Sequence, residues 1–437
     1  MEKADLIIQG CLILPINNKS AIQNGAIAVK DGKITFVGKA SSIQGITAEK
    51  TINGRGKVAI PGLVNCHTHV AMTLFRGLAE DKPLDVWLQE TVWPLEAKLT
   101  SDDVYAGALL GCLEMLKNGV TCFADMYFHE KAVAEAVRQS GIRGVLAEGI
   151  IEAGNKETGE KMFNNSVDFA KNFNGFAEGR VTTMLGPHAA YSCSPELLIK
   201  VREKASELNL GVHIHLAESA EMFKKFEKLH GCCEVEFLHK LGFFEGHVLA
   251  AHCINLSEKD RRVLAKHGVN VVHVPVANMK LGLNVADVKA LLDHGVKVAL
   301  GTDGPASNNT LDMFETMKFA ALLQKHIHHD PTVLPAYQVL RMATLDGAKA
   351  LGLGRITGSL EVGKRADIVL VDVSKPHLKP LNDVYAALVY SARGSDVDTV
   401  IVDGRILMEN RKVQTLDESA VMERAEKCTA DLLARKL

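Results

Sequence analysis

The sequence predicts an α/β protein, a (β/α)8 TIM-like barrel with a small β-sandwich domain formed from both chain ends. The 437 residues are 47% hydrophobic, which is enough apolar material for a large core. The central part alternates short apolar runs with longer amphipathic stretches, whereas both ends consist of short apolar runs separated by turns. Eight β-then-α units in series favour a closed parallel barrel over an open sheet.

The N-terminal segment, residues 1–57, contains three short apolar runs, at residues 5–8, 26–29 and 34–37. Turn-forming glycine and asparagine residues separate these runs, and Asp31-Gly32 is a typical tight turn. This segment is therefore predicted to be the N-terminal part of the small β domain.

The barrel is predicted to span residues 58–357, because eight strand candidates lie there in series. They are residues 58–65, 121–125, 144–148, 181–186, 211–216, 248–251, 269–274 and 296–301. Helical patterns lie between them, for example at residues 101–118, where Asn118-Gly119 is a plausible C-terminal stop.

Beyond Gly358 the strand-and-turn pattern returns. The runs 366–371 and 399–402 lie on either side of an Asp403-Gly404 turn. Residues 358–437 are therefore predicted to be the C-terminal part of the small β domain, where the two chain ends meet.

The composition argues against several classes of protein. The net charge of −2 leaves no basic face for nucleic acid, and 5% aromatic residues do not suggest a base-stacking surface. Nine cysteines without a CxxC pair suit reduced thiols in the cytoplasm. The N-terminus has no apolar signal segment, and no apolar run is long enough to span a bilayer. We expect a cytoplasmic homo-oligomer that acts on a small molecule and binds neither nucleic acid nor a membrane.

Barrel enzymes place their chemistry at the carboxyl ends of the strands, so the residues at those ends are the first candidates for an active site. They are His67, His69, Asp125, Glu148, His188, His215, Glu218, His252, His273 and Asp303. Histidine stands at five of the eight strand ends, which indicates a metal site.

The pair His67 and His69 follows a predicted strand. Residues i and i+2 of an extended chain point the same way, so both imidazoles can bind one ion. Alone, this spacing would fit two half-buried histidines equally well. With His215 and Asp303 ending two further strands, the metal interpretation is favoured. Three imidazoles and a carboxylate suit zinc, although iron or manganese would also fit.

Several motifs resemble the amidohydrolase superfamily. They are residues 61–69 (PGLVNCHTH), 215–218 (HLAE), 251–253 (AHC) and 301–303 (GTD). A closer similarity is to the 5-methylthioadenosine/S-adenosylhomocysteine deaminase family. Its motifs are residues 72–77 (MTLFRG), 93–96 (WPLE), 186–188 (GPH), 304–309 (GPASNN) and 358–367 (GSLEVGKRAD). The resemblance covers nearly the whole chain and is more specific for the superfamily than for the substrate.

The resemblance implies a role for each polar strand-end residue. The metal, held by His67, His69, His215 and Asp303, would activate a water for attack on a ring carbon. Glu218 would carry a proton to a ring nitrogen as general acid and base. Asp303 would accept the proton of the attacking water, and His252 would orient that water. The less favoured alternative for Glu218 is a helix-capping carboxylate at the surface.

Strand four ends in Gly186-Pro187-His188, where superfamily members with two metals have a carboxylated lysine. This departure favours one metal ion, and the resemblance makes His188 a substrate ligand. It also implies that Glu96 holds the ribose hydroxyls. Glu148 stands at the end of strand three, where the family commonly has an arginine. We expect Glu148 to face the 5′ end of the substrate and to disfavour a carboxylate there.

Other noticeable residues are expected to have structural roles. Residues 325–329 (KHIHH) fall in a polar stretch, which suits a solvated surface better than a metal site. His213 lies one layer below His215 and is expected to pack inside the barrel. His273 is expected to make a structural hydrogen bond. Trp87 and Trp93 could form a wall of the pocket or pack in the core.

The function predicted from the resemblance is metal-dependent hydrolytic deamination of an adenine nucleoside, with one divalent ion, most plausibly Zn²⁺, as cofactor. The candidate substrates are 5′-methylthioadenosine, S-adenosylhomocysteine, 5′-deoxyadenosine and adenosine. The alternatives are another mononuclear amidohydrolase, such as a guanine or cytosine deaminase or a triazine chlorohydrolase, and a catalytically dead structural barrel. The plan of other zinc deaminases, His-x-Glu with Pro-Cys-x-x-Cys, is absent from the sequence.

Overall fold

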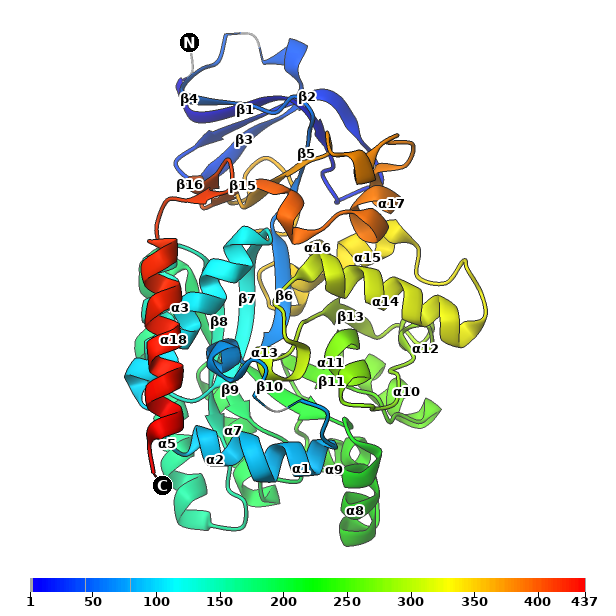
Figure 1. Cartoon of the computed structure of the whole chain (residues 1–437). Coiled ribbons are helices and arrows are strands. Elements are labelled where there is room, and N and C mark those ends of the chain that lie inside the picture. The colour runs from blue at the N-terminus through cyan, green and yellow to red at the C-terminus, as the bar shows by residue number, and fades with distance from the viewer. Residues whose placement is uncertain (1–2, 44, 79, 437) are drawn as a thin grey trace.

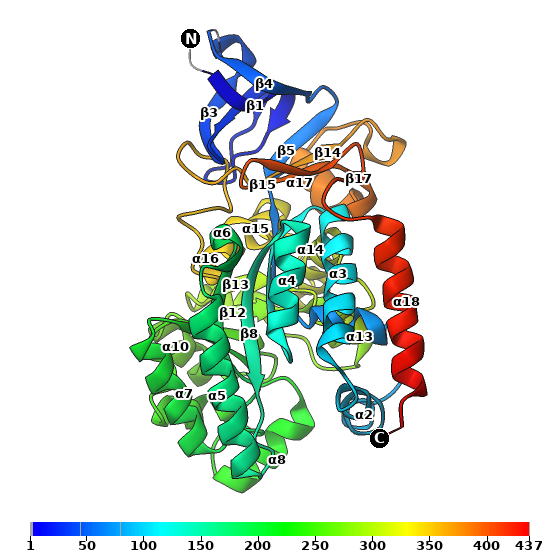
Figure 2. The same cartoon turned by 90° about the vertical axis from the view of Figure 1, so that its left-hand side faces the viewer.

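The computed structural model describes residues 3–436 apart from 44 and 79. A barrel surrounded by helices makes up most of the molecule, and a sheet built from both chain ends lies at one end of it (Figures 1 and 2). The segments near the N-terminus and the C-terminal strands are side by side in both views, as the sequence predicted.

Eight parallel strands form the barrel, each paired with the next in chain order. They are β6 (Leu63–Thr68), β7 (Val120–Tyr127), β8 (Arg143–Ile150), β9 (Val181–Pro187), β10 (Gly211–Leu216), β11 (Val248–His252), β12 (Asn270–His273) and β13 (Lys297–Leu300). The first and last strands contact each other, and the Asp303 N–H donates to the His67 carbonyl at 2.9 Å. The sheet is thus a nearly closed barrel, which confirms the predicted fold class.

Helices follow the strands and cover the outside of the barrel (Figure 1). The longer ones are α3 (Ser101–Lys117), α4 (Glu130–Ser140), α5 (Lys156–Phe173), α7 (Pro195–Glu207), α8 (Ala220–His230), α9 (Glu234–Lys240), α10 (Glu258–Lys266) and α14 (Met313–His328). Helix α3 begins with a capping box between Thr100 and Asp103 and ends at Asn118, close to its predicted limits.

The two chain ends form one nine-stranded mixed sheet. Its strands are β1 (Lys3–Ile13), β2 (Ile22–Lys30), β3 (Lys33–Lys39), β4 (Thr47–Asn53), β5 (Lys57–Pro61), β14 (Ile368–Asp372), β15 (Val397–Val402), β16 (Arg405–Glu409) and β17 (Lys412–Val413). Strands β5 and β14 pair antiparallel and join the N-terminal half to the C-terminal half. Side chains from both halves, among them Ile8, Ile27, Ile368 and Ile401, share one buried core.

The predicted strand at residues 58–65 is in fact two strands in different sheets. Strand β5 belongs to the terminal sheet, and β6 opens the barrel. The break falls at Gly62, whose N–H donates to the Asp367 carbonyl rather than within a barrel ladder. A Cβ at this position would collide with Thr121, so only glycine allows the chain to pass between the two sheets there.

The C-terminal segment also departs from the prediction that residues 358–437 belong to the β domain. Helix α18 (Glu418–Ala434) leaves the terminal sheet and lies along α3 on the outside of the barrel (Figure 1). Arg435 Nη2 donates to Asp103 Oδ1 at 2.9 Å and ties the end of α18 to the start of α3. The chain passes between the terminal sheet and the barrel near both predicted domain limits. The limits at residues 57 and 358 therefore stay predictions.

All nine cysteines have free thiols, and six of them are buried. No helix in the part of the chain that the structure describes is long and apolar enough to cross a membrane.

A buried ion cluster connects the barrel to the terminal sheet. Arg143, at the start of β8, lies 3.2 Å from Asp367 and 2.7 Å from Asp403, two carboxylates of the C-terminal strands. Only 4% of the Arg143 side chain and none of the Asp367 side chain is exposed. Asp367 also accepts the Asp403 N–H at 2.9 Å, so the three residues form one network.

We expect Arg143→Met to lower the free energy of unfolding by about 3–5 kcal/mol, because it leaves the Asp367 carboxylate buried without its cation and Asp403 with Arg365 alone. Thermal or denaturant unfolding monitored by circular dichroism would measure this. Arg138→Met is the matched control, since Arg138 pairs with Glu135 on the exposed side of α4 and should leave stability unchanged. Equal stability of the Arg143 variant and this control would contradict the role given to the cluster.

Candidate active site

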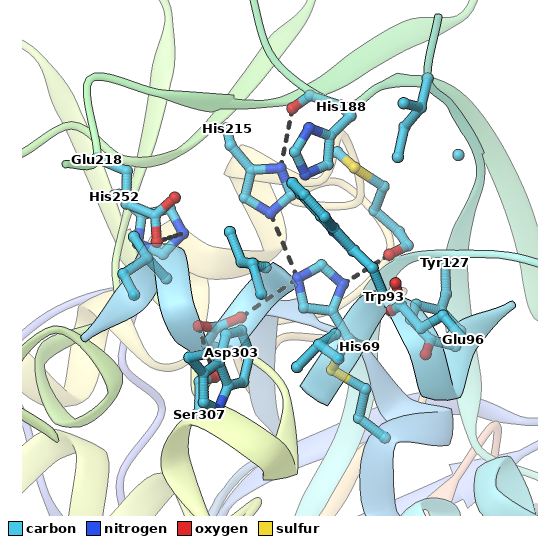
Figure 3. A pocket seen from close by; sticks show the side chains of 18 of the residues that line it. His69, Trp93, Glu96, Tyr127, His188, His215, Glu218, His252, Asp303 and Ser307 are labelled. Atoms are coloured by element: carbon cyan, nitrogen blue, oxygen red, sulfur yellow. Dashed lines mark hydrogen bonds and ion pairs between the residues drawn. The ribbon is translucent and has the colours of Figure 1, made fainter. Parts of the chain in front are cut away.

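A cavity opens at the carboxyl ends of the barrel strands, the usual place of the active site in such barrels. Polar side chains from several strand ends converge in it (Figure 3). The segment α1 (Leu84–Trp87), η3 (Leu88–Val92) and α2 (Trp93–Glu96) covers one side, and both Trp87 and Trp93 line the cavity. The terminal sheet is at the opposite end of the barrel, near the start of the strands.

His69 and His215 face each other across the cavity floor, with their Nε2 atoms 3.3 Å apart (Figure 3). His69 Nδ1 lies 2.7 Å from the Met126 carbonyl, and His215 Nδ1 lies 2.9 Å from the His188 carbonyl. A carbonyl oxygen can only accept, so each Nδ1 carries the proton. When the rings are neutral, two Nε2 lone pairs therefore point at each other, an arrangement that a cation between them would stabilise.

His67 completes this group. It lies near the end of strand β6 and is fully buried. Its Nδ1 lies 2.9 Å from His213 Nε2, whereas its Nε2 has no hydrogen-bond partner. Burial lowers the pKa of His67 to about 4, so at neutral pH the ring is uncharged and able to act as a ligand.

Asp303 supplies the carboxylate of the group. Its Oδ1 lies 3.3 Å from His69 Nε2 and 3.5 Å from His67 Nε2. Its Oδ2 accepts the Ser307 hydroxyl at 2.7 Å, and the Gly304 N–H donates to Oδ1 at 2.8 Å. Burial would raise the pKa of Asp303, but the close contact with His67 Nε2 and the neighbouring imidazoles hold it far below its ordinary value.

Close packing of β13 on β6 brings Asp303 to the histidines. A Cβ at position 301 would lie only 2.9 Å from the His67 nitrogen, so the glycine there is required for this approach. Asp303 itself has a φ of +66°, in the left-handed region that L-residues rarely adopt. Ala217, His252 and Cys253, at neighbouring strand ends, also have positive φ. Such strain is typical of functional sites.

Within the described residues, potential ligand atoms form two mutually close triads. One consists of His67, His69 and Asp303, and the other of His67, His215 and His252; in each, all ligand atoms lie within 4.8 Å of one another. The unpartnered Nε2 of His67 and the facing lone pairs of His69 and His215 fit a bound cation. Imidazole nitrogen with carboxylate oxygen is a donor set that suits zinc.

Glu218 and His252 lie beside the proposed ligands. Glu218 Oε1 is 3.7 Å from His252 Nε2, and His252 Nδ1 is 3.0 Å from Asn278 Oδ1. The amide oxygen accepts, so His252 presents its Nε2 to the cavity. Burial raises the pKa of Glu218 above its ordinary value, which favours the protonated form of its carboxyl group.

Glu96, at the end of α2, and His188, which directly follows β9, face the same cavity (Figure 3). Burial raises the pKa of Glu96 to about 7, and the neighbouring Tyr127 hydroxyl partly opposes this shift. His188 Nδ1 lies 2.9 Å from the Ser192 hydroxyl, which leaves its Nε2 for a ligand. Burial lowers the pKa of His188 to about 4, so this ring is neutral too.

The predicted substrate contact of Glu148 is wrong. Its carboxylate accepts the backbone N–H groups of His129 and Glu130, at 3.0 and 2.8 Å, and so caps the start of α4. Side chains alternate along a strand, and Gly149 and Ile151 face the cavity, so Glu148 points outward to the helices. It does not line the cavity and cannot act on the 5′ end of a substrate.

The structure contradicts the expectation for His273 and places the histidine tract at 325–329. His273 is fully buried, but neither of its ring nitrogens has a hydrogen-bond partner, contrary to the structural bond expected for it. The tract at 325–329 ends helix α14, where His328 Nε2 lies 2.9 Å from Asp287. Neither feature belongs to the site.

Reasoning from the sequence missed the residues that hold the site residues in place. His213 was expected only to pack, but it contacts the ring of His67 directly. The alternation in His213-Ile214-His215 carries that signal, because both histidines face the barrel interior. Ser307, Asn278 and Ser192 orient Asp303, His252 and His188 respectively, and no spacing rule would have paired them.

Two relatives are similar in sequence to this chain over nearly its whole length. A 5′-deoxyadenosine deaminase of Methanosarcina mazei is 49% identical over 99% of both chains. A 5-methylthioadenosine/S-adenosylhomocysteine deaminase of Desulforudis audaxviator is 48% identical over 98% of this chain and 99% of the relative.

Solved structures share the whole fold. An adenosine deaminase from Xanthomonas campestris with bound zinc matches with a TM-score of 0.96 and 34% identity, over 99% of this chain and 100% of that one. A zinc complex of atrazine chlorohydrolase from Arthrobacter aurescens matches with a TM-score of 0.89 and 25% identity, over 97% and 100% of the two chains. The sequence model that describes the amidohydrolase family matches residues 58–407 of this chain. This range includes all the strands of the barrel. The chain belongs to the amidohydrolase family.

Proposed function

We propose that this protein is a hydrolase that deaminates an adenine nucleoside to the inosine analogue and ammonia. The observation that carries the proposal is the cavity floor, where imidazole lone pairs and a carboxylate converge beside Glu218. The names of the full-length relatives, all adenine-nucleoside deaminases, supply the substrate class.

The proposed ligands of a single divalent ion, zinc being the expected one, are His67, His69, His215 and Asp303. The ion supplies Lewis-acid activation of water at neutral pH. Asp303 accepts a proton from the attacking water, and His252 orients this water through Nε2. Glu218 carries a proton to the ring nitrogen next to the attacked carbon, a role that suits its raised pKa.

Glu96 and His188 are proposed to bind the nucleoside. Among the described residues no cation pairs with the Glu96 carboxylate, which faces the cavity and can accept hydrogen bonds from the two ribose hydroxyls. His188 Nε2 is free for a contact with the substrate, because Nδ1 is engaged with Ser192. The apolar walls, which include Trp87 and Phe128, are suited to the flat faces of a purine.

The rival functions fit less well. The end of strand four bears His188 rather than a lysine, so a second metal has no bridging ligand there. A catalytically dead barrel would have no need to keep all four proposed ligands together with Glu218. Triazine and guanine hydrolases share the fold, but ribose hydroxyls give a direct reason for a Glu96 carboxyl group that lines the pocket without an ion-pair partner among the described residues.

The cavity also favours substrates with an uncharged 5′ group. Among the described side chains that line it, none is a lysine or an arginine, whereas Glu96, Glu218 and Asp303 are acidic. Nearby Lys280 is already paired with Glu80 at 2.8 Å. A homocysteine carboxylate in this cavity would lack a counter-ion and would lose its hydration. The expected preference for neutral tails thus persists, but its cause is the missing cation and not Glu148.

An ammonia-release assay tests the proposal. We expect kcat/KM for 5′-deoxyadenosine and 5′-methylthioadenosine to exceed that for S-adenosylhomocysteine by about tenfold or more, the scale of one unpaired charge near a surface. The decarboxylated analogue of S-adenosylhomocysteine is the matched control, and it should recover part of the loss. Preference for S-adenosylhomocysteine would contradict the selectivity, whereas release of ammonia only from guanine, cytosine or triazines would contradict the proposed function.

We also propose a cytoplasmic location, which the nine free thiols support. The expected homo-oligomer stays a prediction that light scattering on the purified protein would test.

A further inference from the structure

Three carboxyl groups lie together in the layer between the barrel and helix α4, behind the strand ends that carry His67 and His69. They belong to Asp125, Glu130 and Glu148. Asp125 and Glu130 are completely buried, and Glu148 is half-buried. Among the described residues none of them forms an ion pair with a lysine or arginine, although the charge of Lys131 acts on Glu148 from a greater distance. Three negative charges so close together, two of them fully buried, would be costly, so one group is expected to hold a proton.

Two of the three carboxylates are well supplied with donors. Asp125 Oδ1 accepts the Thr68 hydroxyl at 2.6 Å and the Val70 N–H at 2.7 Å. Glu148 accepts two N–H groups at the start of α4. Burial raises the pKa of both groups, and these donors oppose that shift by stabilising the ionised forms.

Glu130 differs from its two neighbours. Neither of its oxygens has a hydrogen-bond donor, and neither has Asp125 Oδ2. The Glu130 carboxyl lies within hydrogen-bonding reach of the Asp125 carboxyl. The Tyr127 backbone N–H is nearby but makes no hydrogen bond of ordinary geometry with it. A proton on Glu130, donated to Asp125, satisfies both orphaned groups at once.

We propose that Glu130 is a protonated positioning residue, whose hydrogen bond to Asp125 fixes the loop that presents His67 and His69. Thr68 stands between the two histidines and Val70 follows them, and Asp125 Oδ1 holds both. Burial, together with the charges of Asp125 and Glu148, raises the pKa of Glu130 well above its ordinary value.

The consequence is a chain of contacts from helix α4 to the metal ligands. Glu130 orients Asp125, Asp125 orients the backbone on both sides of His69, and the two imidazoles are thereby aimed into the cavity before any ion binds. Groups that orient metal ligands in this way commonly contribute 10- to 100-fold to metal affinity. The inference rests on the proposed metal site.

The test compares Glu130→Gln with Glu130→Leu in the full-length protein. Glutamine keeps a neutral donor in the same place, whereas leucine removes it. We expect the zinc dissociation constant, measured by competition with a chromophoric chelator, to rise by about 10- to 100-fold in Glu130→Leu and by less than about threefold in Glu130→Gln. Glu135→Leu, elsewhere on the same helix, is the control for general effects on α4.

Infrared spectroscopy gives a second measurement that needs neither metal nor activity, and it holds even if the leucine variant does not fold. The difference spectrum of wild type minus Glu130→Gln should contain the C=O band of a protonated carboxylic acid. Absence of that band, or an unchanged zinc affinity in a folded Glu130→Leu, would overturn the inference while leaving the proposed function intact. Failure of the wild type to bind zinc would instead count against the proposed metal site.

Discussion

Glu218→Gln is expected to lower kcat by about 10²- to 10⁴-fold, the usual contribution of a positioned proton donor. Glutamine has nearly the same shape and can still donate an N–H, but it cannot transfer a proton to a ring nitrogen and take it back. Because Glu218 is not one of the proposed metal ligands, metal content should stay unchanged. The measurements are initial rates of ammonia release and metal analysis on the same preparation.

The control for this variant is Glu227→Gln, a change of the same kind on the exposed surface of helix α8. It should leave both kcat and metal content as in the wild type. A Glu218→Gln enzyme with near-normal turnover would remove Glu218 from the proposed mechanism, and loss of metal in that variant would show that its role lies in the metal site instead.

His215→Ala is expected to abolish both metal binding and activity. The imidazole ends β10, and its proton-free Nε2 is aimed at His69 across the site, where alanine has no donor atom. A metal that activates water contributes several kcal/mol to the transition state, which is on the order of a thousandfold or more in rate. Dialysis against a chelator should lower the wild-type activity to the same degree, and added zinc should restore only the wild type.

His326→Ala is a suitable control, because His326 is an exposed histidine in the tract at 325–329. It should keep the metal content and the rate of the wild type. Full metal content in His215→Ala, measured by plasma mass spectrometry, would exclude this histidine from the ligand set. Metal loss in His326→Ala would point to a second site in that tract.

Periodicity and turn residues were sufficient to predict the barrel. Seven of the eight predicted strands correspond to single strands of the barrel within a few residues, because a buried parallel strand is a continuous apolar run and needs no distant information. The exception is at residues 58–65, where one apolar run serves two sheets. The division there depends on Asp367 and Thr121, which are far away in sequence.

The residues at the strand ends were predictable for the same reason. The barrel topology brings all carboxyl ends together, so His67, His69, His215 and Asp303 had to meet once the strands were placed. Glu148 was misplaced because its orientation depends on the exact strand register. A shift by one residue turns a side chain from the cavity to the helices. Its donors, two N–H groups at the start of α4, are visible only in the folded chain.

The sequence by itself thus determined the fold class, the set of groups that gather at the cavity floor and, through its motifs, the family. Only the tertiary structure decided which ring nitrogen each histidine presents, since Met126, His188 and His213 are brought to those rings from other strands. It also decided that Glu130 is left without a donor beside Asp125. Hydrogen-bond partners and burial are properties of three-dimensional neighbours, whereas strand alternation and turn chemistry are local, and for that reason only the latter can be read along the chain.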